Sequence, residues 1–397
     1  MVTLQMIQEA QESLKGIARK TPLENANRLG ENIYIKSENL QLTGAFKIRG
    51  AYNKIRSLTP EEASHGVIAC SAGNHAQGIA LSATKLGIKS VICMPEGAPI
   101  SKVEATRNYG AEVVLVPGVY DDAAREAERL SKEHGYTFAH PFNDPYVIAG
   151  QGTLGLEIVG DLPTVDMIIV PAGGGGLLAG VAACVKQINP RIEVIGVQAE
   201  GANAIAQSFK AKKYISTDTV STIADGIAVK APGDITVELI NRYADNVVTV
   251  TDNEISEAIL LLMERCKQIV EPSGATPVAA VLKGKVDVKG KRVVCLLSGG
   301  NIDVSFIQCI IEQGLVARHR RLRFTVKLLD KPGSLSQLLN HIADQGANIV
   351  SVAHDRLSTA LSPNETNVSI TCEVGGAEHG KAVVSSLEDF GYTVTIN

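Results

Sequence analysis

Four short segments rich in small residues carry the side chains whose types could do chemistry. They are SENLQLTGAFKIRGAYNKI (37–55), CSAGNHAQGIA (70–80), PAGGGGLLAG (171–180) and LLSGGN (296–301). Backbone N–H groups at the start of a helix bind anions, and glycine lets a phosphate or carboxylate approach the backbone closely. The segments therefore predict an anion-binding site assembled from several loops.

Lys47 is the candidate reactive group of the first segment. It lies early in an otherwise apolar helical stretch, after Thr43 and Gly44 and beside Phe46. A desolvated lysine amine can act as a base or bond covalently to a carbonyl compound. Considered alone, such a lysine is more typical of a surface helix, where its long side chain reaches solvent. Its assignment therefore depends on the other three segments.

The four-glycine loop also fits a different chemistry. Gly174, Gly176 and Ala179 match the G-x-G-x-x-A pattern of dinucleotide-binding turns, and Glu200 ends the next predicted strand. This pattern would predict a nicotinamide-dependent oxidoreductase. It leaves the other three segments without a role.

The elements that must position these loops are predicted by short β-branched runs that alternate with helical stretches. Strands that are apolar throughout, each followed by a helix, indicate parallel sheets buried on both faces, so the fold class is α/β. Ligands are then expected where loops leave the strands. We expect strands at 67–70, 90–94, 112–116, 167–170, 193–197, 246–250 and 293–297, and helices such as 121–134 and 254–268, the latter capped by Asp252.

The organisation changes near residue 315. Beyond it, the pattern follows the β-α-β-β-α-β order of the ferredoxin-like plan: strand 322–329, helix 334–346, strands 348–356 and 366–374, helix 377–390 and strand 392–397. A basic patch precedes it, with Arg318, His319, Arg320, Arg321 and Arg323. We interpret this patch as a solvated linker. The predicted division is a first domain over 1–315, a linker over 316–323 and a second domain over 324–397.

Composition and charge exclude several classes of protein. The 397 residues suggest two or three domains, and 38 basic against 42 acidic residues give a net charge of -4. Neither nucleic acid nor an anionic membrane is therefore an expected partner. The uncharged stretch 167–185 is nearly long enough to span a bilayer, but Pro171 and its glycines would leave backbone groups unsatisfied in lipid. A buried strand, loop and helix explain it better.

The cysteines and histidines give no sign of a metal site. Seven cysteines are scattered without a C-x-x-C pair, and eight histidines lack the spacing of metal ligands. We expect reduced thiols, a cytoplasmic protein and no structural zinc.

Together the four segments resemble the fold-type II pyridoxal-phosphate enzymes, specifically their threonine/serine dehydratase branch. The run around Lys47 and the S-A-G-N-H segment at 71–75 carry this resemblance. It implies two open parallel-sheet α/β subdomains and the cofactor pyridoxal 5′-phosphate. It also implies an ammonia-lyase that converts threonine to 2-oxobutanoate and ammonia, and serine to pyruvate.

The resemblance assigns a role to each matched position. Lys47 would form the Schiff base with the cofactor and then act as base at the substrate's Cα, and Phe46 would pack by the cofactor ring. Asn74 would bond the cofactor's phenolic oxygen. Ser298 would face the pyridine nitrogen, where a neutral hydroxyl suits elimination more than transamination. The phosphate would be held by Gly173, Gly174, Gly175, Gly176 and Leu177, and the substrate carboxylate by Ser71, Ala72, Gly73, Asn74 and His75.

Two positions depart from the related serine racemases. Their second acid/base is a serine where this chain has Ala72, which favours dehydration. Glu200 matches the first carboxylate of their divalent metal site, but Ala206 stands where the second is expected, so no metal is predicted. A catalytically silent amino-acid sensor on the same scaffold is a further alternative.

The C-terminal module resembles the ACT domain, an amino-acid-sensing form of the ferredoxin-like plan. The D-K-P-G-S-L turn at 330–335 carries this resemblance. It implies allosteric control by an amino-acid or nucleotide effector, with Gly333 and Asn348 as candidate contacts. It also implies a homodimer or homotetramer.

Overall fold

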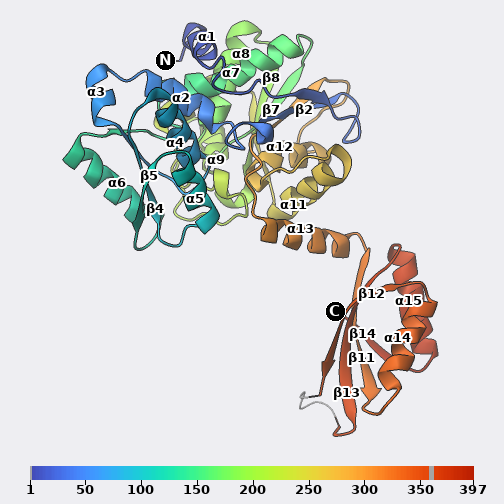
Figure 1. Cartoon of the computed structure of the whole chain (residues 1–397). Helices are drawn as coiled ribbons and strands as arrows, with labels where there is room; N and C mark the ends of the chain where they lie inside the picture. The colour runs from blue at the N-terminus through green and yellow to red at the C-terminus, as the bar shows by residue number, and fades with distance from the viewer. Residues whose placement is uncertain (1, 357–361) are drawn as a thin grey trace. The chain divides into compact units, whose positions relative to one another are not determined.

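The computed structural model describes residues 2–356 and 362–397 (Figure 1). These residues form two compact units, Met1–Ile302 and Asp303–Asn397.

The larger sheet of the first unit has the order β1-β2-β10-β7-β8-β9. Its strands are parallel except for β1, which runs antiparallel to β2 at one edge. Every residue of β7 and β10 is buried, as expected for central strands covered on both faces. The strands are β1 (Leu23–Asn25), β2 (Ile33–Ser37), β7 (Met167–Pro171), β8 (Glu193–Ala199), β9 (Asn246–Val250) and β10 (Val293–Leu297).

The smaller sheet of this unit has the order β5-β4-β3-β6, and all its neighbouring strands are parallel. Both sheets are therefore open and parallel apart from β1, which confirms the two-subdomain α/β plan. The strands are β3 (Val67–Cys70), β4 (Ser90–Pro95), β5 (Glu112–Val116) and β6 (Thr137–Phe138).

Helices and short helical turns connect these strands (Figure 1). The α-helices are α1 (Leu4–Ser13), α2 (Lys47–Arg56), α3 (Pro60–His65), α4 (Asn74–Leu86), α5 (Ile100–Asn108), α6 (Tyr120–His134), α7 (Pro145–Asp161), α8 (Gly176–Ile188), α9 (Ala204–Ala211), α10 (Asp234–Tyr243), α11 (Asp252–Leu261) and α12 (Pro272–Leu282). The short turns are η1 (Glu38–Leu40), η2 (Glu200–Ala202), η3 (Asp225–Ile227) and the π-helical η4 (Leu262–Cys266).

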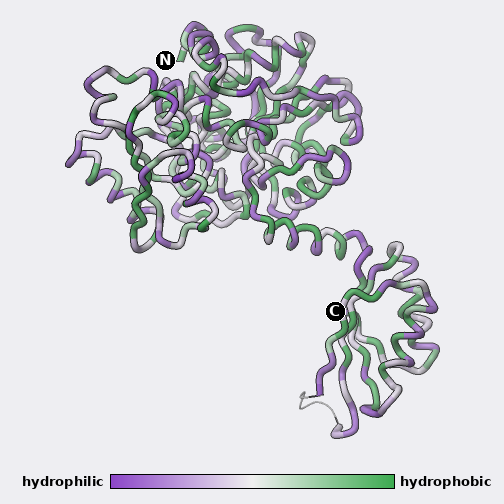
Figure 2. The backbone as a smooth tube through the Cα atoms, in the orientation of Figure 1, coloured by the Kyte–Doolittle hydropathy of each residue, from purple (hydrophilic) through white to green (hydrophobic). Residues whose placement is uncertain are grey.

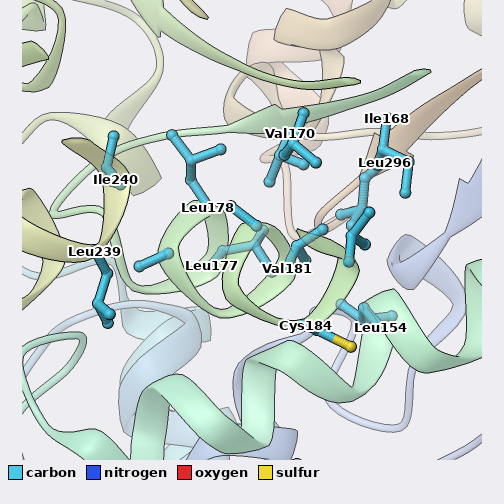
Figure 3. Close-up of a cluster of buried hydrophobic side chains, with 14 of the residues drawn as sticks. Leu154, Ile168, Val170, Leu177, Leu178, Val181, Cys184, Leu239, Ile240 and Leu296 are labelled. Carbon is cyan, nitrogen blue, oxygen red and sulfur yellow. The ribbon is translucent and has the colours of Figure 1, made fainter. Parts of the chain in front are cut away.

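Helix α8 explains the uncharged stretch 167–185. All its residues from Gly176 to Val185 are buried, because the helix packs between the larger sheet and α7. Figure 3 shows Cys184 of α8 beside Leu154 of α7, with Val170 of β7 on the sheet side of the same helix. Among the described residues, the structure contains no helix with the length and apolar character needed to cross a membrane.

All seven predicted strands of the first unit are confirmed. The predicted cap of α11 is wrong, because Asp252 is the first residue of the helix and Thr251 precedes it as the cap. The Thr251 side chain accepts a hydrogen bond from Glu254 N, and the Glu254 carboxylate accepts one from Thr251 N. This reciprocal pair is a capping box, which satisfies two backbone donors at once. The helix was also predicted too long, since a π-helical turn replaces its last part.

The C-terminal unit contains α13 (Val304–Ala317) and one antiparallel sheet of order β12-β13-β11-β14. The β-α-β-β-α-β order predicted for this region is confirmed. Figure 2 shows that hydropathy alternates along α14 and α15. Apolar residues of both helices belong to one core cluster with residues of the sheet. The elements are β11 (Arg321–Leu329), α14 (Ser334–Asp344), β12 (Asn348–Asp355), β13 (Glu365–Glu373), α15 (Ala377–Asp389) and β14 (Thr393–Ile396).

The segment expected to be a linker contains regular structure at both ends. Helix α13 extends to Ala317 and β11 begins at Arg321, so only three residues of the basic patch connect them. Arg321 is paired with Glu312 and Glu373 and its side chain is 7% exposed. The compact unit therefore begins at Asp303, before the expected boundary at residue 315.

Candidate active site

Lys47 is the first residue of α2. The loop before it is joined to the loop after β10 by backbone hydrogen bonds. Phe46 N donates to Ser298 O at 3.0 Å, and Gly300 N donates to Gly44 O at 2.8 Å. These bonds run between segments far apart in the chain. The first and fourth glycine-punctuated segments therefore form one structure, at the carboxyl end of a central strand.

The Lys47 amine is held inside the protein by a neutral acceptor. Its Nζ donates to Pro141 O at 2.8 Å and lies 5.3 Å from the centroid of the Phe46 ring. Burial lowers the pKa of Lys47 from 10.5 to about 8, and the Glu271 carboxyl opposes this shift. A lysine with this pKa is partly neutral near physiological pH, so it can act as nucleophile or base. The structure thus favours a partly buried amine held by a backbone carbonyl over a surface lysine.

Two neutral histidines lie near this amine. Burial, and then the charge of Lys47, lower the pKa of His75 to about 3 and that of His140 to about 4. His75 Nε2 donates to Ala139 O at 2.8 Å, so this ring ties α4 to the segment after β6. His140 Nδ1 accepts a hydrogen bond from Asn143 N at 2.8 Å. His75 was predicted in the substrate-carboxylate group; its ring is bonded to a backbone carbonyl within the core.

The glycine loop connects β7 to α8 with its carbonyl groups turned into the protein. Gly174 O accepts from Thr236 Oγ1 at 2.6 Å, and Gly173 O accepts from Gln198 Nε2 at 3.4 Å. In a trans peptide the next N–H points away from the carbonyl oxygen. The N–H groups of Gly174 and Gly175 therefore point away from these partners, beside the N-terminus of α8. This arrangement can receive a phosphate.

The same loop is packed so closely that side chains do not fit. A Cβ on Gly174 would overlap the Phe142 ring, and one on Gly176 would lie 2.9 Å from Phe142 Cβ. Phe142 follows Pro141, whose carbonyl receives the Lys47 amine. The segment after β6 therefore brings the third glycine-punctuated segment beside Lys47. Gly173 and Gly175 likewise leave no room for a side chain. A Cβ on Gly173 would lie 2.8 Å from Ile227 Cα, and one on Gly175 would lie 2.8 Å from Thr236 Cβ.

Asn74 begins α4 and connects the second segment to the fourth. Its Nδ2 donates to both Glu271 oxygens, at 2.9 and 3.0 Å, and its Oδ1 accepts from Asn301 Nδ2 at 2.8 Å. Ser71, Ala72 and Gly73 form the half-exposed turn between β3 and this helix. Ser71 Oγ accepts from Gly73 N at 3.2 Å. The turn thus leads to a helix N-terminus, as expected of a carboxylate-binding loop.

Ser298 directly follows β10 and is 2% exposed. Leu177 is likewise buried, as the second residue of α8. The contacts described above bring all four predicted segments together.

Glu271 was not predicted from the sequence. It precedes α12, its N donates to Gly299 O at 3.0 Å, and it is 4% exposed. Burial raises the pKa of Glu271 to about 7, and the hydrogen bond from Asn74 opposes this shift. A lone acidic residue between apolar runs was the available signal, because such a residue is seldom buried without a partner. Asn301 belongs to the fourth segment, but no motif predicts its role.

The candidate effector residues are both at the surface of the C-terminal unit. Gly333 precedes α14 with φ 93°, a conformation that favours glycine. Asn348 begins β12, and its Nδ2 donates to Glu373 Oε2 at 3.2 Å. The structure thus places Gly333 at a helix N-terminus and pairs Asn348 with a carboxylate.

Glu200 begins η2 and is exposed. In the part of the chain that the structure describes, no group of three or more histidine, cysteine, aspartate or glutamate side chains is arranged to hold a metal.

Comparison with known proteins gives one family and full-length relatives. Residues 14–299 match the family described as "Pyridoxal-phosphate dependent enzyme". An L-threonine ammonia-lyase from Thermotoga maritima is 47% identical over 400 residues, which cover 100% of both chains.

Solved structures of similar proteins match most of the chain. Threonine deaminase isoform 2 from Solanum lycopersicum is 38% identical with a TM-score of 0.74, over 78% of this chain and 92% of that one. Maize serine racemase is 35% identical with a TM-score of 0.74, over 80% of this chain and 99% of that one.

Proposed function

Because the chain belongs to the family of pyridoxal-phosphate-dependent enzymes, we propose that it deaminates L-threonine to 2-oxobutanoate and ammonia. The same chemistry on L-serine gives pyruvate. The L-threonine ammonia-lyase that matches the whole chain supports threonine as substrate. The seven free cysteines, five of them buried, are consistent with a cytoplasmic setting.

One observation carries this proposal: four loops meet around the Lys47 amine. Lys47 Nζ is bonded to a backbone carbonyl and not to a carboxylate, and its pKa is lowered to about 8 mainly by burial. An amine in this state can exchange protons near neutral pH.

The residues of these loops fit pyridoxal phosphate. The closely packed glycines leave a cradle of outward N–H groups at the N-terminus of α8, which suits a phosphate. The Ser298 hydroxyl, almost fully buried, suits a pyridine nitrogen. Lys47 would hold the cofactor covalently, between the phosphate site and Asn74. When bound, the cofactor supplies an electron sink that stabilises negative charge at the substrate's Cα.

The protein's own groups would then direct the elimination. Lys47 Nζ takes the proton from Cα, because its lowered pKa leaves part of the amine neutral. The turn 71–73 and the first N–H groups of α4, from Asn74, receive the substrate's carboxylate. The neutral Ser298 hydroxyl holds no fixed proton at the ring nitrogen, which tempers the electron sink and suits loss of a β-hydroxyl.

Initial rates test the substrate assignment. We expect 2-oxobutanoate from L-threonine and slower or comparable formation of pyruvate from L-serine, with ammonia released in equal amounts. The control is L-alanine, which has no β-leaving group. Absence of 2-oxobutanoate in protein that carries the cofactor would contradict the proposal.

Racemisation is the second candidate function, because maize serine racemase shares the fold at 35% identity. We propose that dehydration dominates, since Ala72 offers no hydroxyl at the position of the racemases' second acid/base. Ala72→Ser should therefore increase the ratio of D-serine to pyruvate, measured by chiral chromatography. D-serine formed by the wild type as fast as pyruvate would overturn this assignment.

We also propose that the C-terminal unit is an ACT regulatory domain, and that the protein is a homodimer or homotetramer. Its β-α-β-β-α-β order supports this, and Gly333 opens α14 where N–H groups could receive an amino acid's carboxylate. Asn348, at the start of β12, is the second candidate contact. The effector would be an amino acid or a nucleotide.

Truncation tests this regulatory role. A chain ending at Val316 retains all four active-site loops, so it should keep its cofactor and its basal turnover. It should lose the response to isoleucine, valine and adenine nucleotides, because allosteric coupling requires a separate effector site. Rates measured alongside light scattering would separate lost regulation from lost assembly. An unchanged effector response would contradict the proposal.

A further inference from the structure

The orientation of the Asn74 carboxamide is determined by a chain of hydrogen bonds that starts at a backbone carbonyl. This chain, the relay, runs from Thr43 O through Asn301 and Asn74 to Glu271. Thr43 O can only accept, so the atom of Asn301 that lies 2.8 Å from it must be the amide nitrogen. The same nitrogen lies 2.8 Å from Asn74 and donates to it. The atom of Asn74 on this side must therefore be its oxygen.

The opposite end of the relay gives the same answer independently. The other terminal atom of Asn74 lies 2.9 and 3.0 Å from the two Glu271 oxygens. Above the Glu271 pKa of about 7 the carboxylate is ionised and only accepts hydrogen bonds, so this atom must then be the amide nitrogen. Glu271 itself is held by its backbone N–H, which donates to Gly299 O at 3.0 Å. Thr43 O at one end and the ionised Glu271 carboxylate at the other therefore require the same orientation of the Asn74 side chain.

We propose that Glu271 and Asn301 are positioning residues that fix Asn74 as a hydrogen-bond donor toward the cofactor ring. The inference rests on the proposed function, which places Asn74 beside the cofactor's phenolic oxygen. Asn74 Nδ2 carries two hydrogens, and the two oxygens of the Glu271 carboxylate can share one of them in a bifurcated hydrogen bond. The second is available to an oxygen in the site. A reversed amide would present an acceptor there and would repel an ionised phenolic oxygen.

The relay also connects three of the four active-site loops. Thr43 belongs to the loop before Lys47, Asn74 to the start of α4, and Asn301 to the loop after β10. A Cβ on Gly44 would overlap Asn301 Oδ1, so the Asn301 side chain is held against the first loop. Orientation of the carboxamide is thereby coupled to the backbone that carries Lys47.

Asn301→Asp tests the relay because it replaces a donor by an acceptor of the same shape. The introduced carboxylate would face two acceptors, Thr43 O and Asn74 Oδ1, and would favour the reversed amide. We expect kcat to fall about tenfold or more, as when a buried polar partner is lost. The pH at which the bound cofactor's absorption band changes should rise, because the phenolic oxygen loses its donor. Asn301→Ala should have a smaller effect, since Glu271 still orients Asn74.

The double variant Asn301→Asp/Glu271→Gln separates positioning from stability. The amide introduced at position 271 can turn to donate to a reversed Asn74, while the carboxylate at position 301 accepts from it. We expect the Tm of the double variant to recover relative to Asn301→Asp, while kcat and the absorption shift do not. Asn253→Asp, exposed in the first turn of α11, is the matched control.

Three results would overturn the inference. One is an Asn301→Asp enzyme with kcat and absorption close to those of the control. Another is a double variant in which activity recovers together with Tm. The third applies if Asn301→Asp does not fold: Asn301→Ala then decides, and an absorption profile like that of the control contradicts the relay. Failure of the proposed function would instead appear in the wild type, as absent cofactor or absent 2-oxobutanoate.

Discussion

Two cations on helix α2 show how their neighbours make a buried charge either reactive or structural. Lys47 and Arg49 are two residues apart; Arg49 is buried and Lys47 is partly buried. Lys47 meets a neutral carbonyl, and its pKa is lowered to about 8 mainly by burial. Burial also opposes the charge of Arg49, but Glu38 and Glu157 outweigh it and raise the pKa of Arg49.

The Arg49 cluster comprises Lys36, Glu38, Arg49 and Glu157. Arg49 bonds Glu38 at 2.8 Å and Glu157 at 2.6 Å, and Lys36 Nζ bonds Glu157 at 2.6 Å. Two cations therefore balance two carboxylates, in a cluster that joins β2, η1, α2 and α7. Burial alone does not make a cation reactive. Lys47 lacks a bonded carboxylate and can exchange protons near neutral pH, whereas Arg49 is held in its charged form.

The largest effect is expected for Lys47→Ala. Loss of both base and covalent anchor should lower turnover at least about a thousandfold, while the fold is retained. Coupled assay of 2-oxobutanoate, with circular dichroism for the fold, measures both. Lys85→Ala, which removes an exposed lysine of α4, should leave turnover unchanged. Turnover of Lys47→Ala within about tenfold of the wild type would refute the role of this residue.

Arg49→Met should show the opposite pattern, in which stability is lost first. Removal of the guanidinium leaves Glu38 and Glu157 buried with only Lys36 as counter-ion. The free energy of unfolding should fall by about 3–5 kcal/mol, measured by chemical denaturation. Arg191→Met, at an exposed position, is the control. If Arg49→Met were as stable as this control, the contrast between the two cations would fail.

The smallest effect is a pH dependence assigned to Lys47. The pKa of this amine is about 8 in the fold against an ordinary value of 10.5, so between these values the unfolded chain binds the extra proton. Stability of the cofactor-free protein should therefore rise with pH from about 8 to 10.5, by up to about 3 kcal/mol from this residue. Subtracting the same curve for Lys47→Met isolates the contribution. A difference curve that is flat or falls with pH would contradict a buried, unpaired amine.

The sequence predicts the framework well because apolar strands and glycine loops are local signals. The strands 67–70 and 293–297 were predicted with the bounds that the structure has. The short edge strand β1 and its neighbour β2 were not predicted, since their pairing depends on β10 far along the chain. The cap of α11 was misplaced by one residue, because Thr251 and Asp252 are both good caps and the choice depends on the backbone.

The candidate site is only partly visible in the sequence for a similar reason. Lys47 and Asn74 lie in motifs that can be recognised locally. Glu271 becomes informative only when the fold places it against Asn74, about two hundred residues away. The Lys47 amine donates to the backbone carbonyl of Pro141. Every residue has such a carbonyl, so the residue type at this position does not predict the contact. Contacts of these kinds require the tertiary structure.

The central claim, that Lys47 is the reactive amine of this fold, is tested most directly by covalent capture. The yellow holoenzyme is reduced with borohydride and digested, and its peptides are mapped by mass spectrometry. We expect the reduced cofactor on the peptide that carries Lys47, and no labelling of that site in Lys47→Ala. Cofactor fixed to another lysine, such as Lys36 in the neighbouring paired cluster, would contradict the account.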